Sequence, residues 1–162
     1  MRTGSSRGGG RARRLVVSGA IAGIVAGVVA TGAQLALWWL FSEALPGILF
    51  RDARLAAAIV MGPGVLPPPA TFDVVVMLVA TVVHFALSIV YGVVLAPLAA
   101  ALDTRRALLA GGVFGLALFV VNMYGFTLVF PWFDVARDWI TAAAHVVFGV
   151  TAAAFARSRI GA

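Results

Sequence analysis

The sequence predicts an all-α membrane protein, folded as a bundle of four transmembrane helices. Of its 162 residues, 62% are hydrophobic and only 11% are charged, whereas about a quarter of the residues of an average soluble domain are charged. The charged residues form short clusters between long apolar stretches. At 1.5 Å per residue, each of these stretches can cross a hydrocarbon core of about 30 Å.

The first predicted span, residues 15–41, follows a segment made mainly of Gly, Ser and Arg. That segment, residues 1–14, cannot bury apolar surface, so we expect a disordered basic tail. Arg13 and Arg14 also allow a cleaved signal peptide, but its apolar region would be only about 7–15 residues long. The longer stretch seen here favours a membrane anchor.

Three further stretches complete the transmembrane domain, residues 15–157, before a short tail at 158–162. These spans are 74–101, 107–130 and 139–156. Asp73 is placed to cap the second helix, because Asp accepts hydrogen bonds from the free N–H groups of a helix start. The polar segment 103–106 is a tight turn that joins the second and third spans into a hairpin.

The longest connection, residues 42–73, carries a polar cluster, Arg51-Asp52-Ala53-Arg54, before the apolar segment Leu55–Met61. A Gly/Pro-rich run, 62–69, follows. This pattern fits a short interfacial helix and then an extended proline segment. A re-entrant cap over the bundle fits equally well.

The distribution of arginine predicts the orientation, because arginine is enriched in cytoplasmic segments next to spans. Both termini are expected in the cytoplasm, leaving few arginines outside: Arg51, Arg54 and Arg137. The chain has no lysine, and together with its Ala, Gly and Val content this is typical of a bacterial genome rich in GC. We therefore expect a multi-pass protein of the bacterial inner membrane. Because the arginines flank apolar spans, the expected partner is the lipid bilayer and not nucleic acid.

Glycines recur at four-residue intervals along the spans, a glycine-zipper pattern that lets helix backbones approach closely in lipid. The predicted helix-packing glycines are Gly19, Gly23, Gly27, Gly92, Gly111, Gly115 and Gly149. Such faces pack helices within one chain. They also suggest a homo-oligomer, or a non-catalytic accessory or assembly subunit that docks onto a larger membrane complex.

A few polar side chains interrupt the spans, and polar groups in a membrane normally face the bundle interior. At 1.5 Å per residue they lie roughly 9–15 Å below the outer ends of their helices, in one layer. We expect a polar pocket there that binds a ligand or protons. Its candidate residues are Gln34, His84, Ser88, Tyr91, Asn122 and His145, accompanied by Thr31, Tyr124 and Thr127.

The two halves of the chain follow a similar order: an arginine flank, a glycine face, an amide, an outer turn with proline, and a helix headed by histidine. The amides are Gln34 and Asn122, and the histidines are His84 and His145. This order predicts two repeated hairpins, related by a pseudo-twofold axis along the membrane normal.

Several roles for the polar residues remain open. They could only hydrogen-bond across helices to fix their register. The histidines could bind or pass protons, because imidazole titrates near neutral pH. Haem ligation by His84 and His145 is a further alternative, although no cofactor is required by the sequence. Two histidines without a carboxylate in the spans argue against a metal site. The chain has no cysteine and no recognisable enzyme motif, which predicts a non-enzyme.

Three segments and one turn carry a resemblance to a known family. They are 84–91 (HFALSIVY), 108–112 (LLAGG), 144–147 (AHVV) and the turn 130–134 (FPWFD). Over about the last half of the chain they resemble the YagU-type family of small bacterial inner-membrane proteins, which has been linked to acid tolerance. The chain is also similar to short proteobacterial proteins labelled sodium:proline symporters. Four continuous spans cannot supply a symporter fold. Because the two histidines can titrate, we favour a proton-linked or acid-responsive role, such as transport through the polar pocket.

Overall fold

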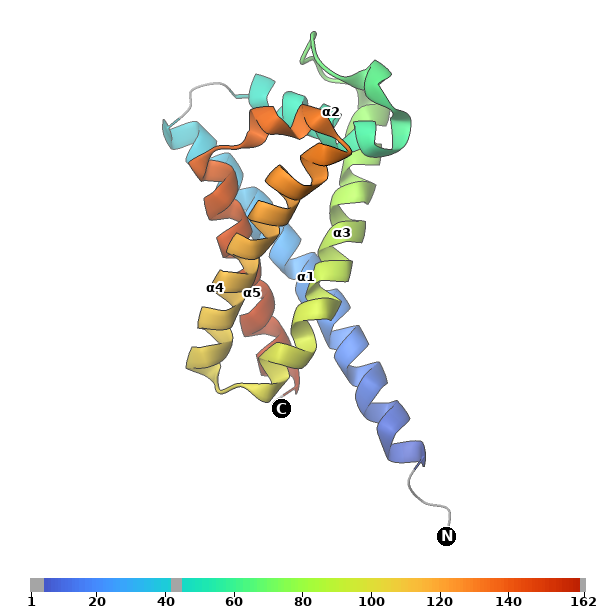
Figure 1. Cartoon of the computed structure of the whole chain (residues 1–162), viewed down its shortest axis with the longest axis vertical. Helices are drawn as coiled ribbons and strands as arrows, with labels where there is room; N and C mark the ends of the chain where they lie inside the picture. The colour runs from blue at the N-terminus through green and yellow to red at the C-terminus, as the bar shows by residue number, and fades with distance from the viewer. Residues whose placement is uncertain (1–4, 42–44, 161–162) are drawn as a thin grey trace.

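The computed structural model describes residues 5–41 and 45–160, and it is an all-helical bundle (Figure 1). Four long apolar helices make it a multi-pass membrane protein, as the composition predicted. The candidate spans are Gly9–Phe41, Val74–Ala101, Thr104–Leu128 and Trp139–Ile160. They belong to helices α1 (Ser5–Phe41), α3 (Val74–Ala101), α4 (Thr104–Val120) and α5 (Trp139–Ile160).

The first helix begins at Ser5, earlier than the predicted start at Leu15. The prediction of a disordered tail is therefore wrong for residues 5–14, while residues 1–4 lie outside the described residues. Once α1 is anchored by packing, each added residue extends it with a backbone hydrogen bond and without a new nucleation cost. Arginine also has a high helix propensity, which favours this extension.

The third span is not the continuous helix that was predicted for residues 107–130. Helix α4 ends at Val120, a π-helical turn spans Val121–Gly125, and a 3₁₀ turn spans Phe126–Leu128. The hydroxyl of Thr127 donates to the carbonyl of Tyr124 at 2.8 Å, so a side chain takes up a main-chain acceptor in this turn. The break occurs where Asn122 enters the bundle, and π turns inside helices are frequent at functional sites.

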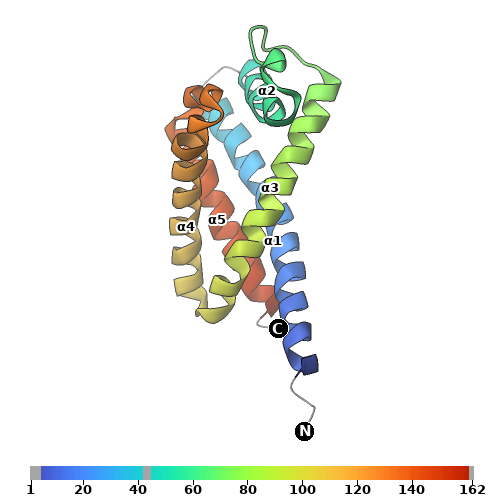
Figure 2. The same ribbon diagram turned by 45° about the vertical axis from the view of Figure 1, so that its right-hand side comes forward.

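The helices pack as two close pairs, α1 with α3 and α4 with α5, and α1 also packs along α5 (Figures 1 and 2). Glycines form both close contacts. A methyl group on Gly92 would lie 2.6 Å from the nitrogen of Gly23, and one on Gly149 would lie 2.8 Å from that of Gly115. Only glycine fits at such distances, so these glycine faces are used within the chain.

Helix α2 (Gly47–Met61) lies across one end of the bundle, which we call the α2 end (Figures 1 and 2). Leu55 is buried in a cluster with Met123 and Ala136, and its carbonyl accepts a hydrogen bond from the indole of Trp132 at 3.1 Å. A 3₁₀ turn, Pro63–Val65, follows the helix. The long connection therefore caps the bundle next to the π turn.

Candidate functional site

The predicted polar residues line one cavity inside the bundle, on the α2 side of its centre. The cavity has a volume of about 150 Å³. Its polar lining consists of Thr31, Gln34, Ser88 and Tyr91 together with His84, Asn122 and His145. All six candidate ligand- or proton-binding residues thus meet at the same place.

Helices α3 and α5 and the π turn are joined by a chain of hydrogen bonds across this cavity. The hydroxyl of Tyr91 donates to Oδ1 of Asn122 at 2.8 Å. Nδ2 of Asn122 lies 3.2 Å from Nε2 of His145, and Nδ1 of His145 lies 2.8 Å from the carbonyl of Thr141. The π turn places the amide between the phenol and the imidazole.

The hydrogen-bond partners of His145 and Asn122 fix which of their atoms carry hydrogen. A carbonyl oxygen only accepts, so Nδ1 of His145 must donate to Thr141. In the neutral imidazole Nε2 then accepts, and it does so from the NH₂ group of Asn122, whose Oδ1 faces Tyr91. When His145 is neutral, each of these three contacts therefore joins one donor to one acceptor.

His84 lies in the other half of the site, against α1. Its Nε2 is 3.4 Å from the hydroxyl of Thr31. A methyl group on Gly27 would lie 3.1 Å from that nitrogen and 2.9 Å from the hydroxyl of Ser88. Gly27 therefore leaves the space in which the imidazole of His84 and the hydroxyl of Ser88 lie.

A second cavity, of about 360 Å³, adjoins the first and lies between α1, α2 and α3. Thr31, Gln34 and His84 line both cavities, and the second one also includes Asp52 and Trp38. A series of polar groups therefore runs from beneath α2 to the hydrogen-bond chain at His145.

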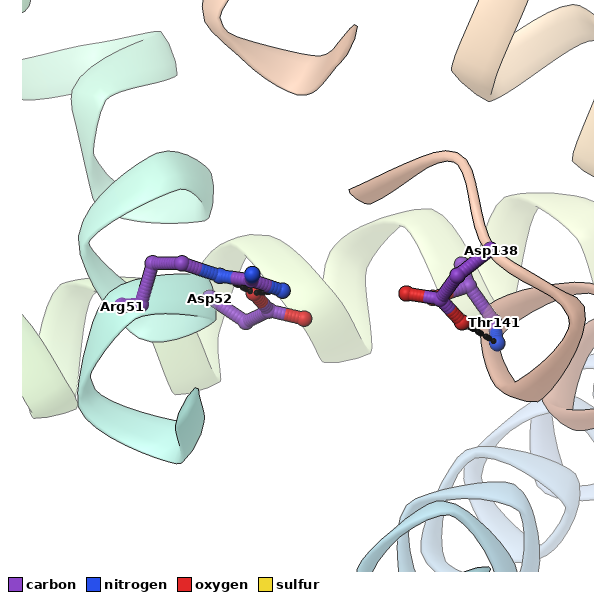
Figure 3. A network of polar contacts seen from close by, with 4 residues as sticks. All are labelled: Arg51, Asp52, Asp138 and Thr141. Atoms are coloured by element: carbon purple, nitrogen blue, oxygen red, sulfur yellow. Dashed lines mark hydrogen bonds and ion pairs between the residues drawn. The ribbon is translucent and has the colours of Figure 1, made fainter. Parts of the chain in front are cut away.

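Sequence reasoning missed an acidic pair at the α2 end. The carboxylates of Asp52 and Asp138 point toward one another between α2 and the start of α5 (Figure 3). Asp52 accepts from Nε of Arg51 at 2.7 Å, and Asp138 accepts from the backbone N–H of Thr141 at 2.8 Å. No spacing in the sequence predicts that these two aspartates face each other.

The electrostatic setting of Asp52 favours its protonated form. Burial raises the pKa of its carboxyl above the usual range, while the hydrogen bond and the charge of Arg51 lower it. The nearby charge of Asp138 raises this pKa further. The balance is an upward shift, because the side chain of Asp52 is only 21% exposed.

Trp38 is buried, unlike its neighbour in the sequence. It is 3% exposed, whereas the neighbouring Trp39 is 73% exposed. Within the described part of the chain, the indole N–H of Trp38 has no hydrogen-bond partner. Trp38 therefore forms part of the second cavity, and no pattern in the sequence separates it from Trp39.

Tyr124 and Thr127, which were expected to accompany the pocket, instead hold Arg137. The guanidinium of Arg137 lies 4.7 Å from the centre of the Tyr124 ring and donates to the hydroxyl of Thr127 at 2.7 Å. It also hydrogen-bonds the carbonyl of Met123 at 2.6 Å. Both residues stabilise the end of the third span.

The cavity does not fit the haem alternative. Its volume of about 150 Å³ is below the roughly 300 Å³ at which small-molecule pockets begin, and both ring nitrogens of His145 have protein partners. A group of three or more His, Asp or Glu side chains that could hold a metal ion is also missing among residues 5–41 and 45–160. The cavity does have room for water, because its volume exceeds the roughly 30 Å³ that one water molecule occupies in the liquid.

Comparison with known protein families, curated proteins and solved structures finds no match for this chain. The resemblance to the YagU-type family therefore stays a hypothesis.

Proposed function

We propose that this multi-pass membrane protein is an acid-responsive protein of the bacterial inner membrane, and that its cavity takes up protons from the outer face. In this proposal the α2 end faces outward and the arginine-rich end faces the cytoplasm. We also propose, from the lack of an enzyme motif in the sequence, that the protein is not an enzyme. The observation that carries the proposal is the continuous polar lining from Asp52, through Gln34 and His84, to the hydrogen-bond chain.

The hydrogen-bond chain can accommodate a proton without losing a partner. Protonation of His145 places a hydrogen on Nε2, which would then oppose the NH₂ group of Asn122. Rotation of the amide by half a turn presents Oδ1 to His145 and the NH₂ group to Tyr91. The phenol oxygen of Tyr91 then accepts from the NH₂ group, and its own hydrogen turns into the cavity, which has room for water. The contacts of Asn122 with Tyr91 and His145 are therefore kept in both states. The site therefore has two discrete arrangements, which a switch requires.

The response would reach the outer surface through the π turn. Asn122 and Met123 are adjacent, and Met123 packs against Leu55 of α2. The Asn122 amide would therefore rotate directly beside Met123, the residue through which the π turn contacts α2. We infer that protonation of His145 loosens the π turn and its contact with α2.

The proton path is one-sided. Between the cavity and the opposite end, the bundle is filled by closely packed apolar side chains. Leu95, Ala96, Ala99, Ala152, Ala153 and Ala156 are all at most 1% exposed. This favours a proton-binding switch over a proton channel, because a proton needs water or polar groups to cross.

The accessory-subunit alternative loses the observation that suggested it. The glycine faces that were expected to dock onto a partner are occupied by the chain's own helices, Gly23 against Gly92 and Gly115 against Gly149.

Hydrogen–deuterium exchange of the protein in liposomes tests the proposal. After correction for the slower intrinsic exchange at low pH, we expect acidification to reduce the protection of amides in residues 121–128 and in α2 of the wild type. This acid effect should be lost in His145→Gln and reduced in His84→Gln. Tyr124→Phe serves as the control because it removes a hydroxyl from the same segment but keeps the aromatic ring that contacts Arg137. An equal acid effect in wild type and His145→Gln would overturn the proposal, as would a steady proton flux through the protein in liposomes.

A further inference from the structure

We propose that the end of the bundle opposite α2 binds a phosphate-bearing anion in a cavity between α1 and α5, held by Arg13, Arg14 and Arg159. This inference is independent of the acid response. It rests on a different cavity, at the other end of the molecule.

The cavity has a volume of about 450 Å³. Arg13 and Arg14 reach it from the start of α1, and Arg159 reaches it from the last turn of α5. Gly10 and the buried Ser18 also line it, and a methyl group on Gly10 would meet nothing within 4 Å. Small residues therefore leave room beside the three guanidinium groups.

The three arginines carry no ion pair within the described part of the chain. The nearest acidic candidate at this end, Asp103, pairs with Arg106 at 3.3 Å and caps α4. Neighbouring Arg157 is already bound to the carbonyl of Ala100 at 3.3 Å. Arg159 also lies 5.8 Å from the centre of the Phe155 ring. Among the described residues, no carboxylate neutralises the positive charge at this cavity.

Phosphate is the anion that this arrangement fits. A guanidinium group offers paired N–H donors that match two phosphate oxygens, and it remains charged at every physiological pH. Basic pockets between transmembrane helices near a membrane surface bind the headgroups of anionic lipids. The apolar side chains of Val17 and Ile160 also line the cavity and would meet the less polar part of a lipid. A soluble phosphate would use the same arginines.

Lipid binding can be measured by native mass spectrometry of the purified protein with phosphatidylglycerol, with phosphatidylcholine and with inorganic phosphate alone. The cavity variant is Arg13→Gln/Arg14→Gln/Arg159→Gln. The control, Arg11→Gln/Arg105→Gln/Arg106→Gln, removes the same charge from the same end but leaves the cavity intact. Circular dichroism establishes that both variants are folded.

We expect the wild type to retain phosphatidylglycerol over phosphatidylcholine, and the cavity variant to lose at least about tenfold in affinity. The control should lose much less. Binding of inorganic phosphate that depends on the same three arginines would identify a soluble phosphate as a ligand of this site. Equal losses in both variants would overturn the proposal, because they would show only a diffuse surface charge. Equal retention of the two lipids would overturn it as well.

Discussion

Ser88 of α3 and His145 of α5 occupy equivalent positions in the two close helix pairs. The backbone carbonyl of Ser88 faces Gly23, and that of His145 faces Gly115 in the same way. Four residues further on, Gly92 and Gly149 complete both contacts. The two hairpins therefore use one packing arrangement, but His84 lies one helical turn before the position that corresponds to His145.

The close glycine contacts predict a position-specific effect on stability. A methyl group on Gly115 would lie 2.8 Å from the carbonyl carbon of His145, so Gly115→Ala must push α4 and α5 apart. Overpacking of this kind costs about 1–3 kcal/mol. Thermal unfolding in detergent, followed by circular dichroism, should show the loss. Gly112→Ala is the control on the same helix, because its methyl group would meet Val150 at an ordinary 3.6 Å. Equal midpoints for the two variants would contradict the packing.

The acidic pair predicts a pH-dependent stability. Burial raises the pKa of Asp52 in the folded protein. The contribution of Asp52 to stability is therefore fully present at pH values below the pKa of its carboxyl in the unfolded protein. It is lost as the pH rises through the raised pKa of this carboxyl in the folded protein. As the pH rises through this range, the wild type should therefore lose more stability than Asp52→Asn, which has no carboxyl at this position. Asp138→Asn keeps a side chain able to cap α5 but removes the nearby charge, so it should lower the pKa of Asp52. Thermal unfolding at a series of pH values measures both effects, and parallel curves for wild type and Asp52→Asn would refute them.

Arg54 is expected to hold the proline-rich connection in place. Its guanidinium donates to the carbonyl of Val65 at 3.0 Å and to that of Thr71 at 3.1 and 3.2 Å. Lysine keeps the charge but cannot reproduce this planar set of donors. Arg54→Lys should therefore speed limited proteolysis between residues 62 and 73, with the four long helices unchanged. Cleavage at the wild-type rate would show that these hydrogen bonds do not hold the segment.

The span positions and the residues of the cavity could be predicted from the sequence because both depend on polarity. Long uncharged stretches reveal membrane helices, and rare polar side chains within them turn inward. Gln34, His84, Asn122 and His145 accordingly line one cavity. Their roles as ligand- or proton-binding residues stay predictions.

Other features depend on contacts that no spacing reveals. The repeated order of residues does not predict the level at which the helices cross, because a four-residue interval marks a helix face and not a height along it. In α3 the crossing involves Ser88, while in α5 it involves His145 itself. The π turn at Asn122 depends on local competition for carbonyl groups. The approach of Asp52 and Asp138 depends on how α2 folds over the bundle.

Nitrogen NMR of the His145 ring and the Asn122 side-chain amide, with the protein in bilayers, tests the acid response most directly. At neutral pH we predict a neutral imidazole with its hydrogen on Nδ1, as the contact with Thr141 requires. On acidification, the imidazole should gain a hydrogen on Nε2 and the amide signals of Asn122 should shift with the same midpoint. An imidazole that stays neutral throughout the pH range in which the protein is folded would contradict the account. So would protonation of His145 without any change at Asn122.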